Sequence, residues 1–134
     1  MSRFTSKIVL LAAGAILFGG GWLLGQQSGN TQKALMHVFA YTPVQGATPQ
    51  DFDNFKKASG ALVGKIPGLK RVWVGKLRRP LDDGGSKREY GVAMEFDDAK
   101  ALDVYARHPA HTDWVKVYEK VRVEGTTTFD ILGE

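Results

Sequence analysis

The sequence predicts an α+β fold in which an antiparallel sheet carries its helices on one face. Three observations support this prediction. Runs of β-branched and aromatic residues are separated by turns rich in glycine or proline, two segments place apolar residues at helical spacing, and a proline interrupts the second of these segments. The elements follow in the order strand, helix, strand, strand, broken helix, strand, which is the split β-α-β arrangement of ferredoxin-like folds.

Residues 1–29 are set apart from the rest of the 134-residue chain. Residues 8–24 are almost wholly apolar apart from glycines, and no acidic residue occurs before Asp51. A bilayer-spanning helix needs about 20 apolar residues, with ~17 as the lower limit, whereas the core of a signal peptide has about 7 to 15. We therefore expect a membrane anchor, with a cleaved signal segment as the alternative, followed by one domain over residues 30–134.

The positive charges near the N-terminus predict an orientation for this segment. Arg3 and Lys7 precede the apolar stretch, and the next positive charge after it is Lys33. The N-terminus should therefore stay in the cytoplasm, with the domain outside it, whereas cleavage would release a secreted domain. Because the chain has no cysteine, the sequence excludes a disulfide framework and a thiolate metal site.

The domain is expected to begin with a strand at residues 35–42, followed by a helix. The run LMHVFAYT is β-branched and aromatic, and a proline closes it. Thr48 is a natural N-cap, Pro49 suits the first helical position, and Asp51 completes a capping box. The helix is expected to continue to the Ile-Pro-Gly that follows, with an apolar face made of Phe52, Phe55, Leu62, Val63 and Ile66.

The middle of the domain predicts an antiparallel hairpin. LKRVWVGKLRR at residues 69–79 and EYGVAMEF at residues 89–96 read as strands, and the PLDDGGSK between them contains a turn-forming Asp-Gly-Gly. This connection is long for a tight turn. VRVEGTTTFDIL at residues 121–132 is expected to form the final strand, because apolar residues alternate at Val121 and Val123 and the alternation resumes from Thr127.

A helix broken at its middle is expected between the hairpin and the final strand. Asp97 or Asp98 should cap its first half. A residue that precedes a proline is pushed out of the helical region, so His108, before Pro109, should lie at a corner. The inner sides of the two halves are expected to carry Leu102, Tyr105 and Ala106, and then His111, Trp114, Val115 and Tyr118.

The first strand is apolar on both of its faces. One face carries Met36, Val38 and Ala40, and the other carries His37, Phe39 and Tyr41. A sheet with one face in water should instead alternate apolar and polar residues. Since the helices cover only one face, we expect the other face to pack against the same sheet of a second copy, which predicts a homodimer.

Several stretches together resemble the stress-responsive dimeric α/β-barrel family, also called Dabb domains. They are HVFAYTP, IPGLKRVWVGK, ALDVYARHPAHTDWVKVYEKV and the late FDIL, and the resemblance spans residues 34–132. It implies a ferredoxin-like fold that dimerises into a closed barrel, and it does not imply a single function. A polyketide cyclase branch uses a histidine and a tyrosine of this motif in aldol-type ring closure. The resemblance therefore implies His111 as a general base, and Tyr105 as a partner that orients the substrate or stabilises an oxyanion.

The residues around the His-Pro-Ala-His motif independently suggest a ligand cavity. Pro109 places His111 in the first helical turn, where the helix dipole disfavours the imidazolium and leaves a ring able to accept a proton. Tyr105 and His111 flank the helix break and can converge between the helices and the sheet. The further candidate ligand-binding residues are His37, Phe39, Trp73, His108 and Trp114. The alternative is that these side chains only pack and cap.

The preferred interpretation is a membrane-anchored or exported domain that binds a small apolar or aromatic molecule. The alternatives are a cofactor-free cyclase, lyase or isomerase using His111 and Tyr105, and a purely structural dimerisation module. We expect no metal, because His108 and His111 supply only two ligands, and no cofactor, because no separate haem motif accompanies His37 or His111. The basic residues between Lys65 and Arg88 are typical of a solvated face, with adsorption to anionic lipid headgroups as the functional alternative. The outward topology argues against a nucleic-acid partner.

Overall fold

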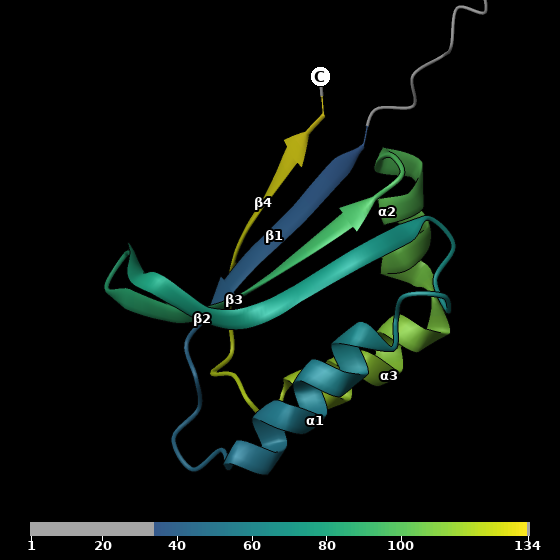
Figure 1. The fold of residues 1–134 in the computed structure, drawn as a ribbon. Coiled ribbons are helices and arrows are strands. Elements are labelled where there is room, and N and C mark those ends of the chain that lie inside the picture. The colour runs from purple at the N-terminus through teal and green to yellow at the C-terminus, as the bar shows by residue number, and fades with distance from the viewer. Residues whose placement is uncertain (1–33, 134) are drawn as a thin grey trace, which may run out of the picture. The chain divides into compact units, whose positions relative to one another are not determined.

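The computed structural model describes residues 34–133. The predicted membrane or signal segment at residues 8–24 lies outside the described residues. The described part follows the predicted order of a strand, a helix, two strands, two short helices and a strand (Figure 1). None of the helices within residues 34–133 has the length and apolar character needed to cross a membrane.

Four strands form one antiparallel sheet with the order β2-β3-β1-β4. They are β1 (Leu35–Tyr41), β2 (Leu69–Asp83), β3 (Ser86–Phe96) and β4 (Thr127–Leu132). The central strand β1 pairs with both β3 and β4, which confirms the ferredoxin-like arrangement. The last strand is shorter than predicted: it begins at Thr127, and Arg122 makes only an isolated bridge to Pro43.

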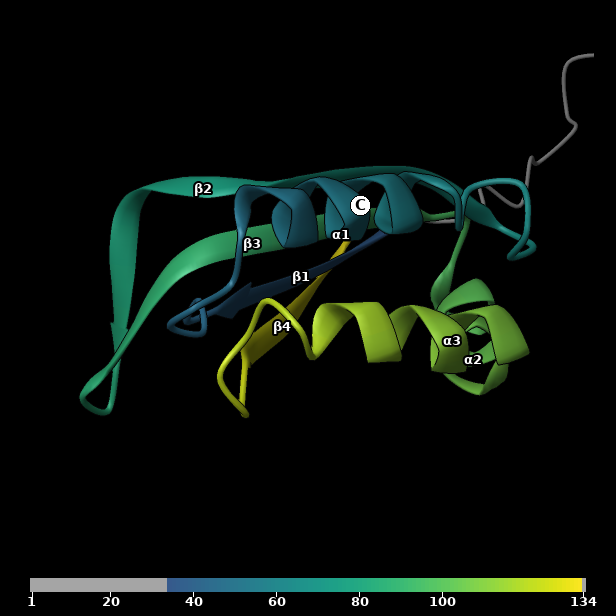
Figure 2. The same ribbon diagram turned by 90° about the horizontal axis from the view of Figure 1, so that it is seen from below.

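The β2–β3 hairpin is longer than predicted because most of the expected connection continues the two strands. Only Gly84 and Gly85 make the turn, with φ angles of 56° and 87° that glycine adopts without strain. The strand register shifts between Lys76 and Leu81. Figure 2 shows the hairpin tip bending away from the rest of the sheet.

The first helix, α1 (Pro49–Gly60), starts where predicted and ends earlier. The capping box is present: Thr48 Oγ1 accepts from the Asp51 N–H at 3.2 Å, and Asp51 Oδ2 accepts from the Thr48 N–H at 2.9 Å. The expected continuation to residue 66 is wrong, because the chain leaves the helix at Gly60 and turns through Gly64, whose φ is 86°. Leu62 and Ile66, which were expected on the apolar face of the helix, are buried but belong to this turn.

Two short helices, α2 (Ala99–Arg107) and α3 (Pro109–Tyr118), meet at His108. His108 has φ −75° and ψ 137°, so it is extended, and it is the C-cap of α2 and the N-cap of α3. The predicted corner before Pro109 is therefore confirmed. Asp98 caps α2 by accepting from the Ala101 N–H at 2.8 Å.

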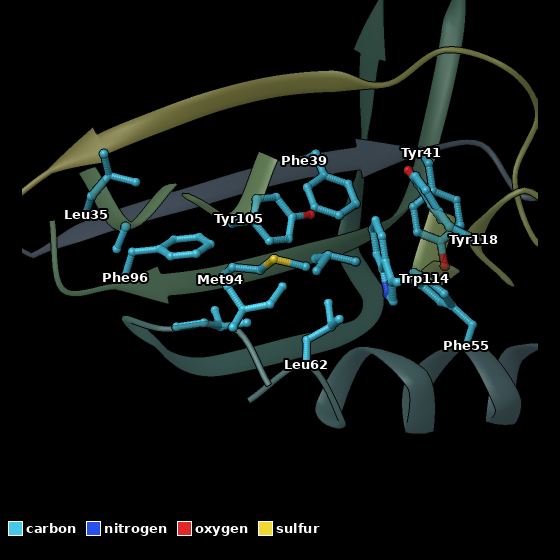
Figure 3. Close-up of a cluster of buried hydrophobic side chains, with 14 of the residues drawn as sticks. Leu35, Phe39, Tyr41, Phe55, Leu62, Met94, Phe96, Tyr105, Trp114 and Tyr118 are labelled. Atoms are coloured by element: carbon cyan, nitrogen blue, oxygen red, sulfur yellow. The ribbon is translucent and has the colours of Figure 1, made fainter. Parts of the chain in front are cut away.

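The core lies between the helices and one face of the sheet (Figures 1 and 3). On β1 this face holds Leu35, Phe39 and Tyr41, and on the neighbouring β3 it holds Val92, Met94 and Phe96. We call the opposite side of the sheet the open face. Its exposed apolar residues include Trp73, Phe129 and Ile131, with exposed fractions of 45%, 47% and 53%. The described helices all lie on the core side of the sheet, as the sequence predicted (Figure 2).

Candidate ligand cavity

A cavity of about 470 Å³ lies between α2, α3 and the helix-facing side of β1. This volume falls within the ~300–1,000 Å³ of small-molecule sites. Its lining is mostly apolar and comes from α2, α3, β1, β4 and the loop that precedes β4. The lining residues are His37, Phe39, Leu102, Asp103, Tyr105, Ala106, His111, Trp114, Val115, Tyr118, Arg122, Thr126 and Thr128.

One wall of the cavity is a row of flat rings on α3. His111, Trp114 and Tyr118 share one face of the helix because they are three and four residues apart. The ring centroids of His111 and Trp114 are 5.7 Å apart, those of Trp114 and Tyr118 are 5.1 Å apart, and both pairs are tilted by only 23°. The row therefore offers a continuous aromatic surface of a kind that suits a planar apolar ligand.

Trp114, in the middle of this row, is held by a buried hydrogen bond. Its indole Nε1–H donates to Ser59 Oγ at 2.9 Å, and the Ser59 hydroxyl donates to the Phe55 carbonyl oxygen at 2.7 Å. Ser59 is fully buried, and Trp114 is almost fully buried. Because the indole has one donor and no acceptor, this bond determines its ring orientation.

His111 lies against Tyr105, with ring centroids 4.3 Å apart. Burial lowers the pKa of His111 below its ordinary value, a backbone hydrogen bond with Ala106 opposes this, and the charge of nearby His37 adds to the lowering. The ring is therefore neutral at neutral pH. This agrees with the expected neutral imidazole, but the main cause is burial rather than the helix dipole. A neutral imidazole carries one N–H and one lone pair, so His111 can accept a hydrogen bond or a proton from a ligand.

A second imidazole enters the cavity from β1. The Nδ1–H of His37 donates to Asp130 Oδ1 at 2.6 Å, since a carboxylate can only accept. This hydrogen bond orients the ring and leaves Nε2 as the nitrogen that can meet a ligand. Sequence reasoning missed Asp130, because the contact depends on the register that pairs His37 with Asp130 across β1 and β4.

Tyr105 projects from α2 between the two histidines. Its ring centroid is 6.1 Å from that of His37, and only 4% of the residue is exposed. Burial raises the pKa of Tyr105, so its phenol stays protonated and can donate a hydrogen bond. Figure 3 shows the Tyr105 hydroxyl directed towards Phe39, on the sheet side of the cavity.

The structure brings five of the seven predicted site residues together and places two elsewhere. His37, Phe39, Tyr105, His111 and Trp114 line the one cavity. Trp73 does not, because its neighbours Val72 and Val74 face the helices and the alternation of the strand puts Trp73 on the open face. The ring of His108 does not line the cavity either. It caps α3 at the corner, where its Nδ1 accepts a hydrogen bond from the Ala110 N–H at 3.1 Å.

Asp113, which follows the His-Pro-Ala-His motif, is the carboxylate nearest to the two histidines in the sequence. Asp113 is exposed and pairs with Lys116, with an oxygen to nitrogen distance of 2.9 Å. Over residues 34–133, no three His, Cys, Asp or Glu side chains are grouped so that they could hold a metal ion.

Comparison with protein families gives a match over most of the chain. Residues 35–131 match the family described as the stress responsive A/B barrel domain, or Dabb. Among curated proteins, none matches the sequence.

Solved structures share the fold at low sequence identity. A hydroxynitrile lyase from Passiflora edulis superposes with a TM-score of 0.63 at 12% identity, over 77% of this chain and 95% of that one. A dimeric ferredoxin-like protein of unknown function from Jannaschia gives 0.60 at 23%, covering 73% and 97%. A Dabb family protein from Mesorhizobium loti gives 0.59 at 21%, covering 75% and 96%. At these identities the likeness shows the fold alone.

Proposed function

The chain belongs to the stress responsive A/B barrel domain family, and we propose that its domain binds a small apolar or aromatic molecule in the cavity between α2, α3 and β1. One observation carries the proposal: a largely apolar cavity of about 470 Å³ receives two oriented histidines and a buried tyrosine. Apolar walls with a few convergent polar groups are the general signature of a small-molecule site.

The polar groups are suited to orient such a ligand. The neutral His111 ring can accept a hydrogen bond, the Nε2 of His37 faces the ligand, and the Tyr105 hydroxyl can donate a hydrogen bond. The aromatic row on α3 supplies the contact area. A ligand with a flat ring and a hydroxyl or carbonyl group would use both.

Native mass spectrometry of the gently purified full-length chain tests this proposal. We expect added mass from a co-purifying molecule. The variant Thr128→Trp places an indole into the cavity, because Thr128 lines it. Thr112→Trp is the matched control, because Thr112 is exposed on α3 and does not line the cavity. The added mass should disappear in the first variant and persist in the second; persistence in both would place the ligand elsewhere.

Catalysis without a cofactor is the second candidate function. The observation in its favour is that a neutral histidine, His111, and a histidine held by a carboxylate, His37, both lie beside a protonated tyrosine. His111 would remove a proton as a neutral base, and Tyr105 would stabilise the negative charge that develops on oxygen. A hydroxynitrile lyase shares this fold.

Mandelonitrile is a practical probe for this class of reaction. A base takes the hydroxyl proton, the bond to the nitrile carbon breaks to give benzaldehyde and cyanide, and that proton leaves with cyanide as hydrogen cyanide. Benzaldehyde release above the spontaneous rate should be lost in His111→Gln and in Tyr105→Phe. It should persist in His108→Asn, which keeps a capping side chain and lies outside the cavity lining. Equal rates in all three variants would exclude these roles.

We also propose that the open face is covered by a second copy of the chain. Trp73, Phe129 and Ile131 are exposed there, and none of the helices within residues 34–133 covers them. A contiguous apolar surface of this kind marks an interaction site on a folded protein. The structural neighbour from Jannaschia is described as dimeric.

The role of residues 8–24 remains the one proposed from the sequence. We propose that this apolar stretch anchors the chain in a membrane with the domain outside the cytoplasm, or is removed as a signal segment during export. The charges of Arg3 and Lys7 before it and its apolar length support this proposal.

A further inference from the structure

We infer that the ligand of this cavity is an acid, and that Arg122 binds its anionic group. The inference rests on the proposed function, because it names the chemical class of molecule that the cavity takes. It identifies the end of the cavity near Arg122 as a site for a carboxylate, attached to an aromatic or conjugated body that lies along α3.

The state of the Arg122 side chain is the first observation. Its guanidinium carbon lies 4.6 Å from the ring centroid of Tyr118, so the cation rests on the end of the aromatic row. Arg122 is partly buried and lines the cavity, and its Nε is buried without a hydrogen-bond partner. A partly buried cation without a partner is unfavourable, and no acceptor within residues 34–133 forms a hydrogen bond or ion pair with this guanidinium.

Two other arginines of the domain, unlike Arg122, have polar partners. Arg71 makes a close pair with Glu95, at 2.7 Å, and the buried Arg88 donates to two threonine hydroxyls and a backbone carbonyl. Among residues 34–133, no carboxylate forms such a pair with Arg122. A planar guanidinium matches a carboxylate in geometry as well as in charge, so an acid is the natural acceptor.

The charges of the cavity differ between its two ends. Asp130 lies at the histidine end, beside His37, where it would repel an anion. Arg122 follows the other end of α3. From His111 to Tyr118 the helix rises ~10.5 Å, since each residue adds ~1.5 Å. A one- or two-ring acid therefore fits with its anion at Arg122, its rings beside Trp114 and its neutral end at the histidines.

Glu119 and Glu124 are the competing acceptors. They share a separate surface hollow with Arg122, and both are exposed. If one of these glutamates pairs with the Arg122 guanidinium in solution, the charge of Arg122 adds nothing to the binding of an anionic ligand. The experiment below distinguishes this case from an Arg122 that is free to bind an anion.

The test compares two probes with the same ring system, 2-naphthoate and 2-naphthalenemethanol, for binding to the full-length chain by titration calorimetry. The first is an anion at neutral pH and the second is neutral. We expect 2-naphthoate to bind at least about tenfold more tightly, which is the size of one charge-assisted hydrogen bond. Added salt should weaken the binding of 2-naphthoate more than that of the alcohol.

Three variants test whether the charge of Arg122 causes this preference for the anion. Arg122→Gln should bring the two probes to equal affinity by weakening the binding of 2-naphthoate, whereas Arg122→Lys should keep part of the preference. Arg107→Gln removes the same charge from an exposed position outside the cavity and should behave as the wild type. Circular dichroism checks that each variant is folded.

Each result has a distinct meaning. Equal affinities in the wild type, or a preference that survives Arg122→Gln, would overturn the inference and leave the cavity as a site for neutral molecules. If neither probe binds to the wild type, the proposed cavity function fails, and the inference fails with it.

Discussion

Ser59→Ala is the substitution whose effect can be worked out most directly from the structure. Ser59 Oγ is the acceptor for the buried indole N–H of Trp114, and it is itself fully buried in α1. Alanine suits a helix and fills nearly the same volume, so the change removes little apart from the hydroxyl. It leaves the Trp114 N–H without an acceptor in the core.

The expected cost follows from that unpaired donor. An unsatisfied buried polar group costs about 1–3 kcal/mol. The bond that the Ser59 hydroxyl donates to Phe55 adds little, because the Phe55 carbonyl lies within α1 and has its own helical partner. For a domain of this size each kcal/mol lowers the Tm by about 4–8 °C. A fall in Tm of about 4 to 24 °C is therefore expected.

Urea unfolding, followed by far-ultraviolet circular dichroism, measures the cost in a double-mutant cycle with Trp114→Phe. Phenylalanine carries no N–H, so removing the Ser59 hydroxyl in that background should cost clearly less than in the wild type. A coupling of at least about 1 kcal/mol is expected. Equal costs in the two backgrounds would refute the claim that this hydrogen bond holds the cavity wall.

Three further predictions concern pH, assembly and the N-terminal segment. Because the pKa of His111 is lowered in the folded state, the unfolded chain binds that proton more readily, so stability is fully present above about pH 6.5 and falls as the pH drops through the folded pKa. Urea midpoints measured from about pH 7.5 to about pH 5 should fall less steeply in His111→Gln than in the wild type. Trp73→Glu should convert a dimer into a folded monomer in light scattering, whereas a wild-type monomer would contradict the proposed interface. Residues 8–24 should hold the chain in membranes during alkaline extraction, and intact mass that lacks this segment would show signal cleavage instead.

The sequence alone determined those features that depend on neighbouring residues. Thr48 and Asp51 are three positions apart, and the capping box they form needs nothing beyond the first turn of α1. Pro109 excludes the helical conformation at the residue before it, so the corner at His108 was predictable. The family resemblance and the order of the elements were recognisable for the same reason, because both are properties of the chain in sequence.

The tertiary structure decided everything that depends on which segments meet. Strands β1 and β2 are apolar on both faces, so alternation separates Trp73 from Val72 but does not say which of them meets the helices; packing placed Trp73 on the open face. His37 and Asp130 are 93 positions apart and meet only through the register of β1 and β4. Arg122 reaches the cavity because the chain after α3 turns back beside Tyr118, a path that no local pattern encodes.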